Sequence, residues 1–268
     1  MTRLAIVVVS FNAREDLANT IASLHDAPPG IPHEIVVVDN ASSDGAAAMV
    51  RERFPAVRVI DAGGNLGFAR ANNIGIRATS SELVLLLNPD TRVTPGAIDA
   101  MVREMDRNRE VVAMGPRLID GEGRAELSFG SMYNPWSEAR RKLVLTMDAR
   151  GFGPTRRWIE RATRQRRVVD WVSGACLLVR RDAGEAADWL DERYFIYAED
   201  VDFCAALRRA GGQVIFSPTA EIVHLRGRSG RINPGPTRDA WRASHLAFYR
   251  KHLPRWAGLL EWYLSRTA

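Results

Sequence analysis

Cysteine is scarce in this chain, and its scarcity excludes two kinds of stabilising feature. Only Cys176 and Cys204 occur among the 268 residues. Two isolated cysteines cannot build the dense disulfide framework of a small secreted domain, nor a cysteine-rich zinc site. Both are therefore expected to be small core residues in a protein that folds in a reducing compartment.

Long apolar runs are also missing. No run approaches the roughly 20 residues that cross a bilayer. The N-terminal stretch MTRLAIVVVSFN carries one Arg and a short apolar run that stops at Ser10, without the cleavage site of a signal peptide. We therefore expect a cytoplasmic protein without a membrane span. The length allows one large α/β domain or two small ones.

Two common nucleotide-binding motifs are absent as well. The sequence contains no GxxxxGK[ST], which excludes a P-loop. The first apolar run is followed by Ser10-Phe11-Asn12 rather than GxGxxG, which argues against a dinucleotide site of the Rossmann type. Any nucleotide must therefore be bound by a different set of residues.

The charge that is present is distributed unevenly. The net charge is +5, but residues 138–170 carry +6 and residues 224–268 carry +7, which leaves about −8 on the rest. An acidic body with two basic segments suggests an anionic partner, such as a nucleotide, a membrane surface or nucleic acid. A solvated basic face is the simpler alternative.

Apolar runs alternate with amphipathic segments through the first half of the chain. Such a pattern predicts an α/β fold with a mostly parallel central sheet and helices on both faces. Asn12 is expected to cap the first helix, with Glu15 at capping-box spacing. The five expected strands are Leu4–Ser10, Glu34–Val38, Val57–Ile60, Leu83–Leu87 and Val111–Gly115.

The second half is less regular. Residues 120–167 are expected to form a long excursion with some helix. A helix is predicted over Glu199–Arg209, ending at Gly211-Gly212, and two short strands over Gln213–Phe216 and Ala220–His224.

The tail from Thr237 is expected to be helical, with a break at Pro254. It mixes aromatic with basic residues, as does a helix that lies on an anionic membrane. A helix that packs on the body of the protein is the alternative.

Polar residues follow the predicted strands, where ligands bind in parallel sheets. Asp39 follows the second strand, and its carboxylate can accept a hydrogen bond from a base N–H. Asp90 follows the fourth strand behind Pro89, and a carboxylate suits Mg²⁺ or Mn²⁺. A lone Asp after a strand is otherwise a turn or N-cap residue. Polar residues at several strand ends favour a ligand.

A cluster of acids opens the predicted helix at 199. Glu199, Asp200 and Asp202 repel one another, and such clusters are typical of metal or acid/base sites. Negative charge at a helix N-terminus is the structural alternative. Upstream, small residues beside Trp171 suggest a platform for a sugar.

Seven motifs follow one another in an order that resembles a known family. They are VVSFNAREDLANTIASL, EIVVVDNASSDG, GGNLGFARANNIGI, LVLLLNPDTRV, WVSGACLLVRR, FIYAEDVDFCAALRRAGG and HLRGRSG. Over roughly residues 4–230 the chain resembles family 2 glycosyltransferases of the GT-A fold, in particular the bacterial rhamnosyltransferase-like branch. The resemblance implies a GT-A domain over 1–230, with a nucleotide-binding half of about 1–115 and an acceptor-binding half of about 116–230. A basic aromatic helical tail would occupy 231–268.

The resemblance also implies roles for individual residues. Asp200 matches the general base. Asp90 matches the last, metal-binding Asp of the Asp-x-Asp motif, whose first position is Asn88 here, and His224 matches a second metal ligand. Trp171, Gly174 and Glu199 would meet the acceptor. The nucleotide sugar would be bound by Ser10, Asn12, Asp39, Asn40, Asn65, Phe68, Asn72, Asn88, Asp90 and a cation of the HLRGRSG segment, Arg226 or Arg228.

The function implied is inverting transfer of a sugar, with Mg²⁺ or Mn²⁺, from a nucleotide diphosphate sugar to a hydroxyl of a glycan or lipid-linked glycan in cell-surface polysaccharide synthesis. dTDP-rhamnose is the first donor to consider, and UDP- and GDP-sugars stay open. The basic aromatic tail adds a peripheral contact with the inner membrane face. A non-catalytic sugar-nucleotide or glycan-binding protein on the same fold is the alternative. Nucleic acid is not an expected partner, because the basic segments show no RNA-binding signature.

Overall fold

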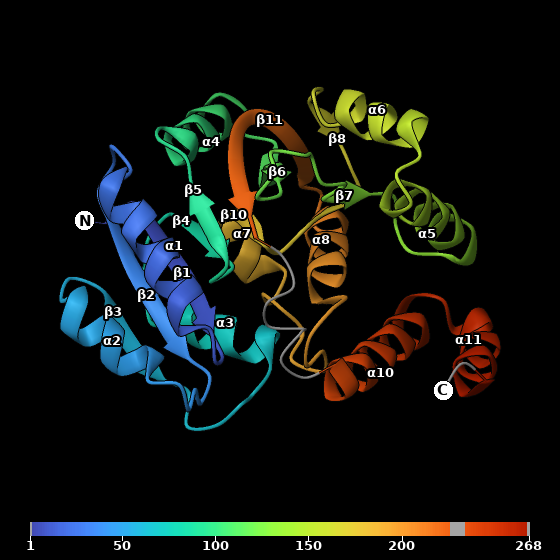
Figure 1. The fold of residues 1–268 in the computed structure, drawn as a ribbon, viewed down its shortest axis with the longest axis horizontal. Coiled ribbons are helices and arrows are strands. Elements are labelled where there is room, and N and C mark those ends of the chain that lie inside the picture. The colour runs from blue at the N-terminus through green and yellow to red at the C-terminus, as the bar shows by residue number, and fades with distance from the viewer. Residues whose placement is uncertain (1, 226–233, 267–268) are drawn as a thin grey trace.

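The computed structural model describes residues 2–225 and 234–266, with the side chains of 234–237 excepted. A large sheet forms the centre, and helices cover both of its faces (Figure 1). The strands are β1 Leu4–Ser10, β2 His33–Asp39, β3 Arg58–Asp61, β4 Leu83–Leu87, β5 Thr91–Val93, β6 Val111–Ile119, β7 Phe129–Gly130, β8 Arg167–Val168, β9 Trp171–Val172, β10 Cys176–Arg180 and β11 Gln213–His224. The helices are α1 Arg14–Asp26, α2 Ala46–Arg53, α3 Phe68–Arg77, α4 Ala97–Arg107, α5 Pro135–Ala149, α6 Gly153–Ala162, α7 Arg181–Ala186, α8 Glu199–Arg209, α10 Pro234–His252 and α11 Pro254–Arg266.

The strand order of the main sheet is β3-β2-β1-β4-β10-β6-β11-β5, with β8 paired to β11. Strands β10, β5 and β8 run antiparallel to their neighbours, and the other pairs are parallel. The prediction of a mostly parallel sheet with helices on both faces is therefore confirmed. Strands β7 and β9 form a separate two-stranded sheet, in which the Phe129 ring lies against Phe216 of β11.

Strand β4 shows why the strands of the sheet appear in the sequence as continuous apolar runs. Leu83, Leu85 and Leu87 pack in the core beneath α1, α2 and α4, while Val84 and Leu86 pack in the core on the side of α3 and α8. Successive side chains of a strand point to opposite faces. Because both faces are covered, every residue of β4 is buried.

Two local predictions are wrong. Asn12 does not cap α1: it adopts a left-handed φ of 50°, and its side-chain oxygen accepts a hydrogen bond from the Ser43 amide at 2.8 Å. The two short strands predicted at 213–216 and 220–224 are one strand, β11, which continues through an irregularity between Ser217 and Glu221.

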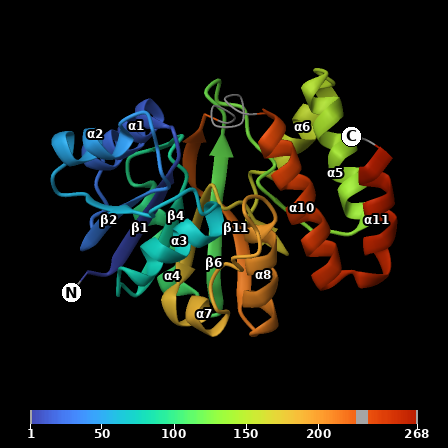
Figure 2. The same ribbon diagram turned by 90° about the horizontal axis from the view of Figure 1, so that it is seen from below.

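The helices α5, α6, α10 and α11 gather at one end of the molecule in both ribbon views (Figures 1 and 2). Helix α10 packs on the body: Phe248 and Tyr249 are buried, and Lys251 Nζ donates to Asp202 Oδ2 and Asp191 Oδ2 at 2.7 Å. On α11, Trp262 is largely exposed. Over the described ranges, no helix combines the length and the apolar character needed to cross a bilayer.

Candidate active site

Asp90 and His224 lie side by side at one edge of the sheet. Antiparallel pairing of β5 with β11 sets Thr91 opposite His224, which brings the residue before Thr91 to the histidine. Asp90 Oδ1 is 3.4 Å from His224 Nε2, and Glu126 Oε2 is 3.2 Å from His224 Nδ1. Burial lowers the pKa of His224, but hydrogen bonds and charge attraction from Asp90 and Glu126 outweigh it and raise that pKa to about 9.

The Asp90–His224 pair fits a shared divalent cation. Mg²⁺ binds its ligands at about 2.1 Å, so two neighbouring ligand atoms stand roughly 3 Å apart, close to the separation observed here. Within residues 2–225 and 234–266, no group of three or more His, Cys, Asp or Glu side chains forms a protein-only metal cage. In proteins, Mg²⁺ is usually bound by a few protein ligands together with the phosphates of the substrate.

Three buried polar atoms at the ends of parallel strands have no hydrogen-bond partner among the described residues. They are Ser10 Oγ at the end of β1, Asp39 Oδ1 at the end of β2 and Asn88 Oδ1 directly after β4. Buried polar atoms in folded proteins are nearly always paired. These three therefore point to a bound polar ligand along this edge.

The other residues that were expected to bind the nucleotide form hydrogen bonds with the surrounding loops. Asn40 Nδ2 donates to Asn65 Oδ1 at 2.9 Å, and Asn40 Oδ1 accepts from the Leu66 amide. Asn72 donates to the Phe68 carbonyl within α3. These bonds fix the walls of the strand-end region. Arg226 and Arg228 lie outside the described residues.

Asp200 is held by backbone amides at the start of α8. The Gly174 N–H donates to Asp200 Oδ2 at 2.9 Å, and the Val201 N–H donates to Oδ1 at 2.8 Å. A Cβ on Gly174 would stand 3.3 Å from the Asp200 Cβ, so glycine permits this close approach. The two residues that precede α8, Tyr197 and Ala198, adopt left-handed φ values of 70° and 66°. Such strained conformations cluster at functional sites.

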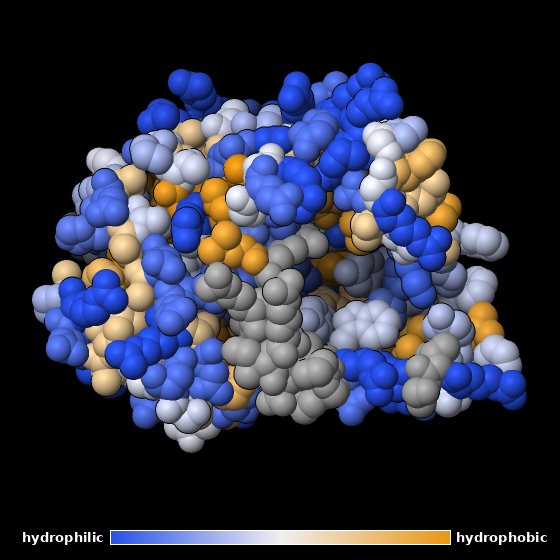
Figure 3. Space-filling view, in the orientation of Figure 1, coloured by the Kyte–Doolittle hydropathy of each residue, from blue (hydrophilic) through white to orange (hydrophobic). Residues whose placement is uncertain are grey.

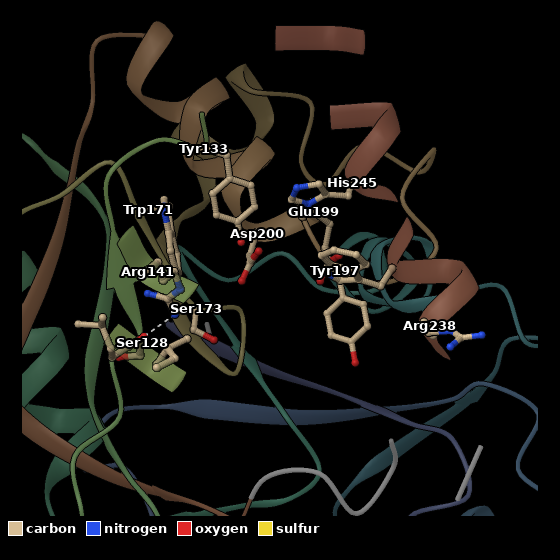
Figure 4. Close-up of a pocket in the computed structure, with 14 residues that line it drawn as sticks. Ser128, Tyr133, Arg141, Trp171, Ser173, Tyr197, Glu199, Asp200, Arg238 and His245 are labelled. Carbon is tan, nitrogen blue, oxygen red and sulfur yellow. Dashed lines mark hydrogen bonds between the residues drawn. The ribbon is translucent and has the colours of Figure 1, made fainter. Parts of the chain in front are cut away.

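Asp200 lines a pocket of about 710 Å³ (Figure 4). In the close-up, its carboxylate lies between Trp171 on one side and Tyr197 on the other. Arg141 and Arg238 add two guanidinium groups to the wall. Aromatic rings beside a carboxylate and cations suit a sugar that carries a negatively charged group. The aromatic side chains of the lining are Tyr133, Trp171, Tyr197, Trp241 and His245.

Glu199 and Asp200 titrate as a pair. Burial, followed by repulsion from Asp200, raises the pKa of Glu199 well above its ordinary range. Burial also raises the pKa of Asp200, while the Gly174 and Val201 amides and the Arg141 guanidinium oppose that rise. We infer that Glu199 holds a proton and that Asp200 carries the negative charge, since Asp200 alone has these stabilising partners. Glu199 Oε2 is buried and has no hydrogen-bond partner in the described part of the chain.

One short turn connects the two parts of the site. The Asn88 amide donates to the Ala175 carbonyl at 2.9 Å, beside the Gly174 amide that binds Asp200. The turn thus joins Asn88, two residues before Asp90, to the amide that holds Asp200.

Sequence reasoning missed several residues of this site. Glu126, Tyr133 and Arg141 come from the 120–167 excursion, whose only sequence signal is its basic and aromatic composition. The third acid of the cluster, Asp202, is used differently from its neighbours, because it binds Lys251 and His252 of α10.

The sequence profile of Glycosyl transferase family 2 matches residues 5–183. The chain belongs to this family. It is 31% identical to the N-acetylglucosaminyl-diphospho-decaprenol L-rhamnosyltransferase of Mycobacterium tuberculosis, over 97% of this chain and 89% of that protein. It is 26% identical to the low-salt glycan biosynthesis hexosyltransferase Agl10 of Haloferax volcanii, over 82% of this chain and 66% of that protein. The predicted rhamnosyltransferase-like family 2 membership is confirmed.

Solved structures of glycosyltransferases share the fold. GalNAc-T7 with UDP, GalNAc and Mn²⁺ superposes with a TM-score of 0.65 at 16% identity, over 91% of this chain and 48% of that one. The mannosyltransferase PcManGT of Pyrobaculum calidifontis, in complex with GDP-Man and Mn²⁺, gives 0.63 at 18% identity, over 97% and 68%. This glycosyltransferase therefore has the predicted GT-A fold.

Proposed function

We propose that this family 2 glycosyltransferase is an inverting, metal-dependent enzyme that transfers rhamnose from dTDP-rhamnose to a hydroxyl of a lipid-linked glycan in cell-surface polysaccharide synthesis. The observation that carries the proposal is the position of Asp200 in an aromatic pocket, joined by the Gly174–Ala175 turn to the Asp90–His224 pair. The name of the Mycobacterium tuberculosis relative supports the choice of sugar and of acceptor class.

The donor would lie along the ends of the parallel strands. Ser10, Asp39 and Asn88 each offer a buried polar atom there without another partner in the described residues. Asp90 and His224 would hold Mg²⁺ or Mn²⁺. When bound, such a cation neutralises the charge that develops on a leaving diphosphate.

Asp200 would act on the acceptor. Its carboxylate accepts the proton of the acceptor hydroxyl as that oxygen attacks the anomeric carbon, opposite to the departing nucleoside diphosphate. One C–O bond forms while the other breaks, so a single displacement inverts the configuration. Glu199, which holds its proton, can donate a hydrogen bond to an acceptor oxygen. General-base assistance of this kind typically contributes about 10²–10⁴-fold in rate.

The experiment is a panel of dTDP-, UDP- and GDP-sugars, assayed with Mg²⁺ and with Mn²⁺. Metal-dependent turnover of one donor, with an inverted product, supports the proposal. Thermal stabilisation by one donor identifies the nucleotide independently, because a ligand that binds only the folded state stabilises it. Stabilisation without turnover of any donor or acceptor would instead favour the non-catalytic binding protein.

We also propose that the tail forms part of the acceptor side and rests on the inner face of the membrane. On α11, Leu259 and Trp262 are 55% and 54% exposed, and Arg255 and Arg266 flank them on the same face. On α5, Trp136 is 79% exposed. Exposed aromatic and basic side chains on one helix face are typical of helices in the bilayer interface. Figure 3 shows the surface hollowed between the α5 and α10 regions, where a membrane-borne acceptor would enter.

A further inference from the structure

Glu126 lies on the far side of the His224 ring from Asp90. The three side chains form a row, with His224 Nε2 3.4 Å from Asp90 Oδ1 and His224 Nδ1 3.2 Å from Glu126 Oε2. All three residues are at most 9% exposed. Burial of an unpaired carboxylate is costly in free energy, and the His224 ring is a partner that lies against the Glu126 carboxylate.

The backbone around Glu126 is fixed by the sheet. The Glu126 amide donates to the Leu118 carbonyl of β6 at 2.9 Å, and Ile119 forms a bridge with Ala125. Two residues on, the Ser128 carbonyl accepts from the Ser173 amide at 2.8 Å. These bonds hold the backbone of the segment against β6 and the pocket, so that the Glu126 side chain starts from a fixed position beside His224.

We propose that Glu126 is a positioning residue: its carboxylate accepts the Nδ1–H of His224 and so leaves Nε2 as the nitrogen that would bind a divalent cation shared with Asp90. The inference rests on the proposed role of the Asp90–His224 pair. A neutral imidazole carries its proton on either nitrogen, and only the Nδ1–H form presents Nε2 to a metal. A carboxylate behind a metal-binding histidine fixes both tautomer and ring orientation, and its loss typically weakens metal affinity.

The test measures Mn²⁺ binding in the presence of dTDP, from the electron paramagnetic resonance signal of free Mn²⁺. Glu126→Leu should weaken Mn²⁺ binding by about 10–100-fold, the usual effect of losing such a partner. Glu126→Gln keeps an oxygen that can accept the Nδ1–H, so its loss should be smaller, about tenfold or less. Glu122→Gln is the matched control, because Glu122 lies on the same segment, exposed and paired with Arg124. Its Mn²⁺ affinity should equal that of the wild type.

A second readout separates tautomer control from mere packing. With Mg²⁺ and dTDP bound, ¹⁵N spectra of histidine-labelled protein should show His224 protonated at Nδ1 in the wild type and in Glu126→Gln. In Glu126→Leu the ring should become a mixture of tautomers. If Glu126→Leu fails to fold, the wild-type spectrum carries the test, and a proton on Nε2 of His224 there would overturn the proposal.

Two further variants distinguish failure of this inference from failure of the proposed function. If Asp90→Ala and His224→Gln bind Mn²⁺ as the wild type does, the metal pair itself is wrong, and Glu126 loses its role with it. If both weaken binding while the Glu126 variants keep wild-type affinity, or if His224 carries its proton on Nε2, the positioning role alone is overturned.

Discussion

At the scale of single residues, Asp200 is the side chain on which the chemistry depends most. Asp200→Asn keeps the shape and the acceptor for the Gly174 amide but removes the basic oxygen. We expect the transfer rate to fall by about 10²–10⁴-fold, while the donor still stabilises the protein against heat. Product formation and thermal unfolding measure the two effects. Wild-type turnover in this variant would show that another group removes the proton.

Arg141 gives a prediction on pH. Asp200 must be ionised to act as a base, so activity is lost as the pH falls through its pKa. Burial places that pKa above the ordinary value of about 3.9, and the positive charge of Arg141 limits the rise. Arg141→Met should therefore move the acid limb of the pH–kcat/KM profile to higher pH, whereas Arg141→Lys keeps the charge and should leave it near the wild-type position.

Arg141 also donates to the Leu127 and Phe129 carbonyls, and its guanidinium lies 4.7 Å from the centre of the Trp171 ring. Thermal unfolding of both variants is therefore the control for altered packing. An unchanged acid limb in a folded Arg141→Met protein would contradict the electrostatic explanation.

At the scale of elements, sequence patterns predicted those elements whose bounds depend on neighbouring residues. Strand β4 was predicted with its observed bounds, because a short apolar run between polar residues records burial on both faces. The prediction for Asn12 failed because its conformation depends on Ser42 and Ser43, which are distant in the sequence. The predicted break between two short strands at 217–219 is wrong, because β11 pairs with β6 on both sides of its irregular residues.

The attachment of α10 to α8 gives a prediction on stability. Lys251 binds Asp202, which is almost fully buried, and Asp191. Removing one partner of a buried ion pair leaves an uncompensated charge and costs about 3–5 kcal/mol, reduced here because His252 still contacts Asp202. Lys251→Met should therefore lower the free energy of unfolding in urea by about 2–3 kcal/mol.

The neighbouring residue supplies the control for this prediction. Arg250 pairs with Glu261 on the surface, where an ion pair contributes about 0–1 kcal/mol. Arg250→Met should change stability little. Equal losses in the two variants would mean that the Lys251 contacts do not anchor the helix.

At the scale of the whole molecule, the two halves of the site differ in how far sequence predicts them. Asp39, Asn88 and Asp90 stand at strand ends, and parallel topology brings strand ends to one edge. The pocket around Asp200 draws instead on Tyr133 and Arg141 from the excursion and on residues of α10. No periodicity or spacing encodes how these segments dock, so only the folded chain shows that they complete the pocket around Trp171, Glu199 and Asp200.

The end of the molecule formed by α5, α6 and α11 gives the last prediction. If α11 lies in the membrane interface, Leu259 and Trp262 leave water on binding, and full burial of such a side chain stabilises by roughly 1.5–3 kcal/mol. The double variant Leu259→Gln/Trp262→Gln should therefore lose about tenfold or more in binding to phosphatidylglycerol vesicles, measured by co-sedimentation.

Vesicles of neutral phosphatidylcholine should bind the wild type less, because Arg255 and Arg266 lose their anionic partner. Turnover with a soluble acceptor should be unchanged, since neither residue lines the pocket. Equal sedimentation of variant and wild type with anionic vesicles would show that α11 exposes these side chains for another purpose.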